Sequence, residues 1–154
     1  MKNYLAKLLA TFFGIGYLPL IPGTFGSLAG AAIYYFLWKH ELIFYAVLFL
    51  VTLAGFGVCG RAETAFGEKD PRRVVIDEVA GVMIAFILVP FTWINAIVIF
   101  VLFRFMDIVK PYPIRKLEKM PGGAGIMLDD IAAGIYTNLL FQIGFSIIYF
   151  FLTC

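Results

Sequence analysis

Four long stretches of the chain contain no Asp, Glu, Lys or Arg: residues 8–38, 42–60, 79–103 and 131–154. A helix needs about 20 apolar residues to cross the hydrocarbon core of a bilayer. Hydrophobic residues make up 62% of the chain and charged residues 14%, against roughly half and a quarter in soluble domains. We therefore expect an all-α, polytopic membrane protein, a single domain over residues 1–154 with about four apolar segments and an amphipathic N-terminus.

The first apolar stretch is interrupted by glycines and prolines, namely Gly14, Gly16, Pro19, Pro22, Gly23 and Gly26. A straight helix through them would leave backbone groups unpaired in lipid. The spanning part should therefore begin near Thr24 or Ser27 and end at Trp38. The second stretch then returns after the polar corner Lys39-His40-Glu41, and a charged loop is expected over residues 61–78.

The third apolar stretch is interrupted by Val89-Pro90-Phe91-Thr92-Trp93-Ile94-Asn95. Each half is too short to cross a bilayer alone, so the stretch is either one kinked helix or a re-entrant hairpin. Basic residues concentrate in residues 2–7, 61–73 and 104–119. The positive-inside rule places all three in the cytoplasm. Only the hairpin satisfies this rule, so we favour the hairpin.

Two helical stripes each begin with a pair of carboxylates and continue with small residues. At about 100° per residue, each pair straddles the small residue that follows it. One stripe contains Asp77, Glu78, Gly81 and Ala85, and the other contains Asp129, Asp130, Ala133 and Thr137. Because small residues four apart let helix backbones approach closely in a membrane, we expect the two stripes to pack together and to juxtapose the carboxylates.

A third group of charges, Arg104, Asp107 and Lys110, is spaced three residues apart and lies on one helical face. Alone, it could be an ion-pair ladder. Together, the three groups would place five carboxylates at close range, where like charges repel unless protons or cations intervene. Hard oxygen ligands without histidine or thiolate suit Mg²⁺, so the pattern indicates a divalent metal site.

Mg²⁺ combined with arginine and lysine is typical of sites that bind phosphate. The segment over residues 22–27 adds backbone N–H groups and two hydroxyls at the start of a helix, which can bind an anion. It lacks the lysine of a Walker A loop, and it could also be only a glycine-rich bend. His40 is the sole histidine, so a phosphohistidine mechanism that needs more than one histidine is not expected. The remaining mechanism is attack by a water that is activated by metal and carboxylate.

Four ordered blocks of residues resemble the phosphatidylglycerophosphatase A family of bacteria. The blocks are Gly14-x-Gly16 with Pro22-Gly23-Thr24-x-Gly26-Ser27; Ile76-Asp77-Glu78 with Gly81; Phe103-Arg104 with Asp107, Lys110, Pro111 and Pro113; and Gly122-Gly123 with Asp129-Asp130 and Ala133-Gly134. The resemblance implies a multi-pass, Mg²⁺-dependent phosphatase of the inner membrane. Such an enzyme removes the terminal phosphate of phosphatidylglycerophosphate, a phospholipid of the bilayer, in phosphatidylglycerol biosynthesis.

We infer individual roles within these blocks. Glu78, Asp129 and Asp130 are expected to bind the metal; Asp77, Asp107, Arg104 and Lys110 to act in catalysis; and Gly23, Thr24, Gly26 and Ser27 to bind the substrate phosphate. In this scheme Asp77 or Asp107 orients the water, and Arg104 and Lys110 also hold the phosphate. The active site would face the cytoplasm.

A different class of function, a small oligomeric ion-coupled membrane transporter, would also use broken helices and intramembrane charges. The charges of this chain cluster at the ends of the apolar stretches rather than in their middle, which favours the enzyme. Nucleic acid is not an expected partner, because the basic residues are scattered among acids.

Overall fold

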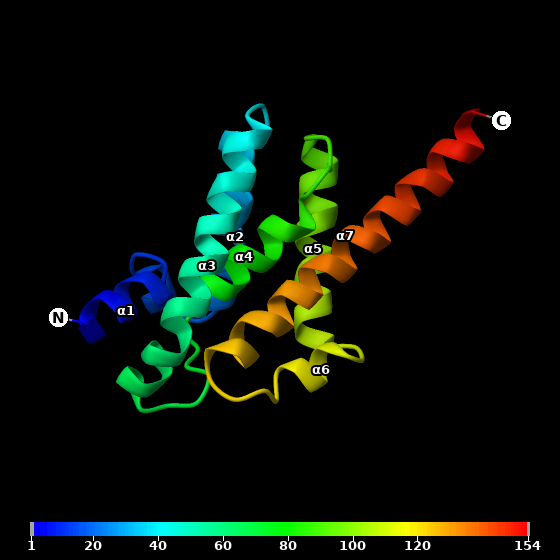
Figure 1. Ribbon diagram of the computed structural model, residues 1–154. Helices are drawn as coiled ribbons and strands as arrows, with labels where there is room; N and C mark the ends of the chain where they lie inside the picture. Colours follow the sequence, from blue (N-terminus) through cyan, green and yellow to red (C-terminus); the bar gives the residue numbers. More distant parts are fainter. Residues whose placement is uncertain (1, 154) are drawn as a thin grey trace.

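A computed structural model describes residues 2–153, which form helices and no strand (Figure 1). The elements are α1 (Lys2–Ala10), a short 3₁₀ helix (Ile15–Tyr17), α2 (Pro22–Leu37), α3 (Glu41–Phe66), α4 (Ile76–Ala85), α5 (Trp93–Val109), α6 (Ile114–Leu117) and α7 (Gly123–Thr153). The prediction of an all-α fold is confirmed.

Two helices, α3 and α7, are long and apolar enough to cross a membrane, over Glu41–Phe66 and Gly123–Phe151. Only 22% and 17% of their most apolar stretches is buried inside the protein, so they are not core helices of a soluble domain. About four apolar segments, some of them broken or re-entrant, were expected, and two helices among residues 2–153 have the length and composition of a membrane span. Helices α2 and α5 have 16 and 17 residues, because the glycine-proline segment and a turn shorten the apolar stretches that contain them.

The third apolar stretch folds back on itself, as the hairpin prediction requires. Helix α4 ends at Ala85, residues 86–92 turn, and α5 returns toward the end from which α4 started (Figure 1). The backbone N–H of Asn95 donates to Thr92 Oγ1 over 3.0 Å and so caps α5. The charged loop is shorter than expected, because α3 continues to Phe66 and leaves only residues 67–75 outside helices.

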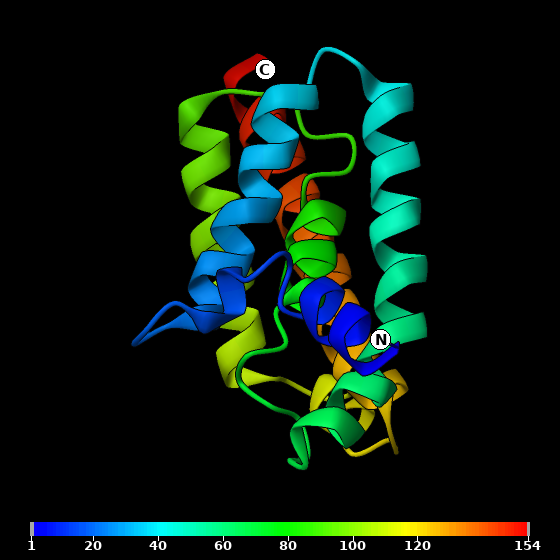
Figure 2. The same cartoon turned by 90° about the vertical axis from the view of Figure 1, so that its left-hand side faces the viewer.

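Helix α4 is the core of the molecule and is surrounded by α2, α3 and α7 (Figure 2). Eight of its ten residues are buried, which fits a helix that is apolar on all sides. It meets α7 through glycines: a Cβ at Gly81 would lie 2.6 Å from the carbonyl oxygen of Asp130, and one at Gly134 would overlap the Gly81 carbonyl oxygen. The predicted packing of the two stripes is confirmed, although the closest contact uses Gly134 rather than Ala133.

Helix α2 approaches the other side of α4 through a second pair of glycines. A Cβ at Gly26 would lie 2.9 Å from the Val75 Cβ, and one at Gly30 would overlap the side chain of Val82. This Gly-x-x-x-Gly spacing permits close contact between backbones. The close approach carries the N-terminus of α2 to the carboxylates at the start of α4.

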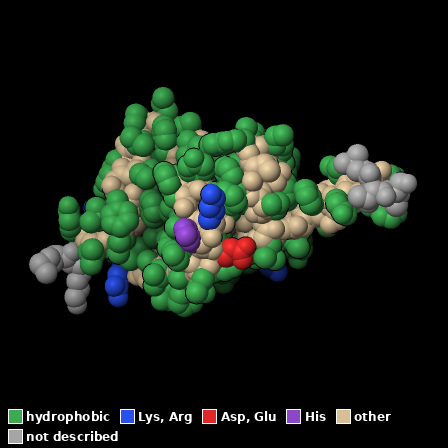
Figure 3. Space-filling model, turned by 90° about the horizontal axis from the view of Figure 1, so that it is seen from above, with side chains coloured by type: hydrophobic (Ala, Val, Ile, Leu, Met, Phe, Trp, Pro, Cys, Tyr) green, Lys and Arg blue, Asp and Glu red, His purple; other side chains and the backbone are tan. Residues whose placement is uncertain are grey.

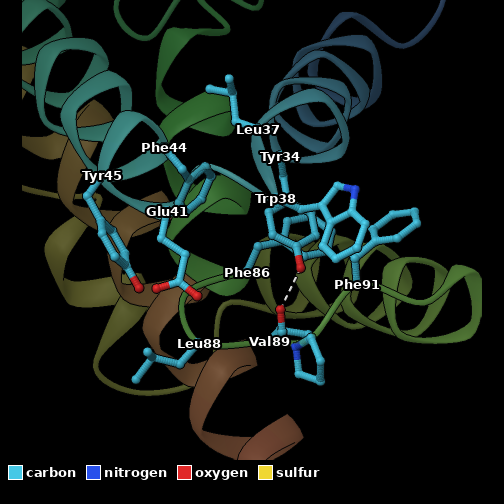
Figure 4. Close-up of a pocket in the computed structure, with 11 residues that line it drawn as sticks. Tyr34, Leu37, Trp38, Glu41, Phe44, Tyr45, Phe86, Leu88, Val89 and Phe91 are labelled. Atoms are coloured by element: carbon cyan, nitrogen blue, oxygen red, sulfur yellow. Dashed lines mark hydrogen bonds between the residues drawn. The ribbon is translucent and has the colours of Figure 1, made fainter.

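Aromatic side chains close the opposite end of the molecule (Figure 4). The Tyr34 ring stacks on Phe86 with centroids 4.3 Å apart, and the Tyr34 hydroxyl donates to the carbonyl oxygen of Val89. A cavity of about 400 Å³ opens among these rings, next to Glu41 and Phe91. Seen from this end, the surface is mainly hydrophobic and shows few charged side chains (Figure 3). These contacts hold the turn over residues 86–92 against α2.

Replacement of Tyr34 by phenylalanine should destabilise this end of the fold. The substitution leaves the buried Val89 carbonyl without its donor, so we expect the free energy of unfolding to fall by about 1 kcal/mol. Denaturant titration in detergent measures the change. Tyr35→Phe is the matched control, because Tyr35 is 41% exposed and its hydroxyl makes no hydrogen bond among the described residues. Equal stability of the two variants would contradict the role of the Tyr34 hydroxyl.

Replacement of Gly81 by alanine tests the contact between α4 and α7. The added methyl group would press on the Asp130 carbonyl and the Phe103 ring, so we expect a loss of about 1–3 kcal/mol in the free energy of unfolding. Gly57→Ala in α3 is the control, because a Cβ there meets nothing within 4 Å and alanine favours helix by about 0.5–1 kcal/mol. If the Gly81 variant were as stable as the Gly57 variant, the close packing described here would be wrong.

Candidate active site

A pocket of about 300 Å³ opens where the N-terminus of α2, the loop over residues 67–75 and helices α4, α5 and α7 meet. Its charged lining residues are Asp70, Arg72, Asp77, Glu78, Arg104, Asp107, Lys110, Asp129 and Asp130. The hairpin of α4 and α5 is what brings the first turn of α4 and the end of α5 to one place. All seven of the charged residues expected at the site from the sequence therefore line one pocket.

Three carboxylates at the bottom of this pocket lie close enough to share one ion. Asp77, Glu78 and Asp130 each offer an oxygen atom, and these atoms lie within 4.8 Å of one another. Asp77 is 6% exposed and Asp130 is 4% exposed. One buried oxygen of each of the three has no hydrogen-bond partner among residues 2–153. Buried charges without partners are costly, so the cluster requires protons or a cation.

Burial also alters the acidity of these groups. It raises the pKa of Asp77 well above its ordinary value, with the negative charges of Glu78 and Asp130 adding to the effect. Burial raises the pKa of Glu78 to about 7. A divalent cation would replace the protons and satisfy the unpaired oxygen atoms at the same time. Because all three ligands are hard oxygens, the donor set fits Mg²⁺.

The two basic residues expected at the site are both held by carboxylates. Arg104 Nη1 donates to Asp107 Oδ2 over 2.7 Å and to Ser27 Oγ over 3.4 Å. Lys110 Nζ donates to Asp129 Oδ2 over 2.7 Å and to Glu118 Oε1 over 2.8 Å. Burial alone would lower the pKa of the Lys110 ammonium, but these two hydrogen bonds raise it above its ordinary value.

The structure therefore groups the acids differently from the scheme inferred from the sequence. Asp77, expected to orient water, lies with Glu78 and Asp130, whereas Asp129, expected to bind metal, forms an ion pair with Lys110. The sequence reveals that Asp129 and Asp130 straddle one helical face. It does not reveal that α5 delivers a lysine to one side of that face and α4 delivers two carboxylates to the other.

The expected phosphate-binding segment is only partly at the pocket. Gly23 and Thr24 line it, and a side chain at Gly23 would collide with Glu78 Oε1. Gly26 is a buried packing residue against Val75. Ser27 is fully buried, and its hydroxyl donates to the Gly23 carbonyl over 3.0 Å. Ser27 therefore supports Arg104 and the α2 N-terminus rather than facing the pocket.

Sequence reasoning missed three charged residues: Asp70 and Arg72, which line the pocket, and Glu118, which binds Lys110. Arg72 lines the pocket from the loop before α4, but nothing in the sequence distinguishes it from Arg73, which instead lies over the Phe66 ring at 5.6 Å. Glu118 completes the double ion pair of Lys110. The turn at Pro111 and Pro113 separates Lys110 from Glu118. The two residues do not belong to one helical repeat, so no periodicity predicts their ion pair.

Comparison with known proteins identifies the family of the chain. The profile of the family described as phosphatidylglycerophosphatase A matches residues 8–145. No solved structure matches the chain. Among curated relatives, the chain is 41% identical over 140 residues to phosphatidylglycerophosphatase A of Haemophilus influenzae. This alignment covers 86% of this chain and 84% of that protein. It is 36% identical over 143 residues to phosphatidylglycerophosphatase A of Escherichia coli, covering 89% and 82%.

A third relative, from Bacteroides thetaiotaomicron, is described as a candidate phosphatidylinositol-3-phosphatase. It is 40% identical over 151 residues, which is 92% of this chain and 94% of that protein. None of these matches is a transporter, so the alternative function receives no support. The profile spans all four blocks of site residues and the lining of the pocket. The chain therefore belongs to the phosphatidylglycerophosphatase A family and is a phosphatase.

Proposed function

We propose that this protein hydrolyses the terminal phosphate of phosphatidylglycerophosphate to give phosphatidylglycerol and inorganic phosphate, and that the reaction depends on Mg²⁺. The observation that carries the metal dependence is the cluster of Asp77, Glu78 and Asp130, whose oxygen atoms lie within 4.8 Å of one another and include buried atoms without partners. The substrate is the one named by the family.

Asp77, Glu78 and Asp130 would hold the ion. When bound, Mg²⁺ supplies charge that offsets the phosphoryl oxygens and favours deprotonation of water. We assign Asp107 to orient the attacking water and accept its proton, since Asp107 lines the pocket and its Oδ2 is fixed by Arg104 over 2.7 Å. The water oxygen bonds to phosphorus as the bond from phosphorus to the glycerol oxygen breaks, and the proton accepted by Asp107 passes to that oxygen to form the hydroxyl of the product.

Arg104 is the better of the two cations to bind the phosphate. Only its Nη1 is engaged by other described residues, so its remaining N–H groups can donate to phosphoryl oxygens. Lys110 already binds Asp129 and Glu118. Its proposed role changes accordingly, from a direct phosphate ligand to the group that balances Asp129 and fixes α7 against the end of α5. Gly23 and Thr24 offer the backbone at the start of α2.

We place the protein in the bacterial inner membrane as a multi-pass protein, with α3 and α7 crossing the bilayer. The pocket end carries Arg72 and Lys110, and the basic segments over residues 61–73 and 104–119 adjoin it. The positive-inside rule then assigns the pocket to the cytoplasmic side.

A second candidate substrate, phosphatidylinositol 3-phosphate, follows from the name of the Bacteroides thetaiotaomicron relative, which is 40% identical to this chain. Both lipids present a phosphomonoester to the same carboxylates. They differ in the alcohol that leaves, which is a primary glycerol hydroxyl in one and a ring hydroxyl in the other. Release of phosphate from the two lipids, compared side by side in detergent, distinguishes the two functions.

Asp130→Asn should abolish most phosphate release from phosphatidylglycerophosphate, because the amide removes one of three expected metal ligands. Loss of a group that supports a metal site costs about 10–100-fold, so a direct ligand should cost at least about 100-fold. The assay is phosphate release in detergent with and without Mg²⁺. Glu68→Gln, an exposed loop substitution, is the control and should retain activity. Full activity in the Asp130 variant, or in wild type without metal, would contradict the mechanism.

The pH should set how much Mg²⁺ the enzyme needs. Because the pKa of Glu78 is raised to about 7, the metal must displace a proton below that pH, and the Mg²⁺ concentration for half-maximal activity should rise as the pH falls from 8 to 6.

The same shift predicts the stability of the metal-free protein. Between the ordinary carboxyl pKa of about 4.3 and about 7, the folded protein retains a proton that the unfolded chain has lost. Stability should therefore decrease as the pH rises through about 7. Thermal unfolding in chelator and in Mg²⁺ at pH 6 and pH 8 tests this, since the stabilisation by Mg²⁺ should be larger at pH 8. A metal requirement and a stabilisation that do not change with pH would contradict the assignment of Glu78.

A further inference from the structure

We infer that the segment over residues 17–21 is an apolar lip of the active site that contacts the chains of the lipid substrate and guides its phosphate to the carboxylates. The lip is Tyr17, Leu18, Pro19, Leu20 and Ile21. This inference rests on the proposed function and deepens it, since it concerns how a phospholipid, rather than a water-soluble phosphate ester, reaches the same site.

The lip is exposed although it is apolar. Leu20 is 95% exposed, Tyr17 57%, Ile21 54% and Leu18 43%. Isolated exposed apolar side chains are common, but four within five residues form a continuous apolar surface outside any membrane-length helix. Figure 2 shows this segment, in blue before α2, projecting from the body of the molecule.

The local backbone holds Leu20 in this outward position. Leu20 has a φ of 77°, in a region that leucine rarely adopts. The N–H of Ile21 donates to the Pro19 carbonyl over 3.1 Å, which closes a tight turn between two prolines. Proline fixes φ at Pro19 and at Pro22. The conformation of the lip is therefore fixed by its own backbone.

The lip is also continuous with the catalytic pocket. Leu20, Ile21 and Pro22 line the same cavity as Glu78 and Asp130. The loop before α4 contributes Asp70 and Arg72 to the same cavity. The pocket thus combines buried carboxylates with the apolar side chains of residues 20–22. A phospholipid phosphomonoester has the same polarity, with a phosphate at one end and acyl chains at the other.

The inference predicts a selective loss in Leu20→Ser. Phosphate release should be measured from long-chain phosphatidylglycerophosphate in vesicles and from a short-chain, water-soluble analogue with the same headgroup. We expect kcat/KM for the long-chain lipid to fall about tenfold, the scale of losing one buried leucine contact, mainly through KM. The short-chain analogue should react as it does with wild type, because it makes no use of the lip.

Two further variants separate this role from others. Leu53→Ser replaces a leucine of α3 that is 59% exposed and does not line the pocket, and it should leave both substrates unaffected. Leu20→Met keeps an apolar side chain and should retain the wild-type preference for long chains. Because Leu20 is almost fully exposed, Leu20→Ser should unfold at the wild-type temperature, which a thermal scan in detergent checks.

Each other outcome overturns the inference. An equal loss on both substrates would mean that the lip only shapes the pocket, and an equal loss in Leu53→Ser would mean general attachment to the membrane. No loss in Leu20→Ser would remove the lip from substrate binding. If wild type released phosphate from neither substrate, the proposed function itself would fail, whereas activity on both with no effect of Leu20→Ser would leave that function intact and refute only the inference about the lip.

Discussion

The close backbone contact between α4 and α7 is the constraint on which the rest of the structure depends. A side chain at either Gly81 or Gly134 would occupy the space of the other helix. This contact sets the first turn of α4 beside Asp130, so that three carboxylates from two distant segments come within 4.8 Å. Helix α4 thus has two roles in its ten residues, since it forms the packed core of the molecule and presents Asp77 and Glu78 at its first turn.

Much of the fold could be predicted from the sequence because its strongest signals are local. Uncharged stretches indicate apolar helices, and the interruption over residues 89–95 together with the distribution of lysine and arginine selects the hairpin. The ends of the helices could not be predicted as well. Helix α3 extends to Phe66 through Arg61 and Glu63, because charged residues past the apolar stretch remain good helix formers. The length of the uncharged stretches also could not show that, within residues 2–153, only α3 and α7 are long and apolar enough to cross a membrane.

The charged residues that line the pocket could largely be predicted, but the pairs that they form could not. The seven charged residues expected from the sequence do line one pocket. Which acid meets which partner depends on the angle at which helices cross, and helical periodicity carries no information about that angle. Asp129 and Asp130 are neighbours in sequence, yet one meets Lys110 and the other meets Asp77 and Glu78. Glu118 and Arg72 reach the site through turns, where no repeat links position to partner.

The aromatic packing at the far end determines on which side of the molecule the carboxylates can be reached. Between the carboxylates and that end lie Val82, Met83, Phe86 and Ile99, all fully or almost fully buried. Beyond them the Tyr34 ring lies flat on Phe86, and its hydroxyl is occupied by a backbone carbonyl. The acidic pocket and the cavity at the far end share no lining residue. The carboxylates therefore open at one end of the molecule and are separated from the other end by packed apolar and aromatic side chains.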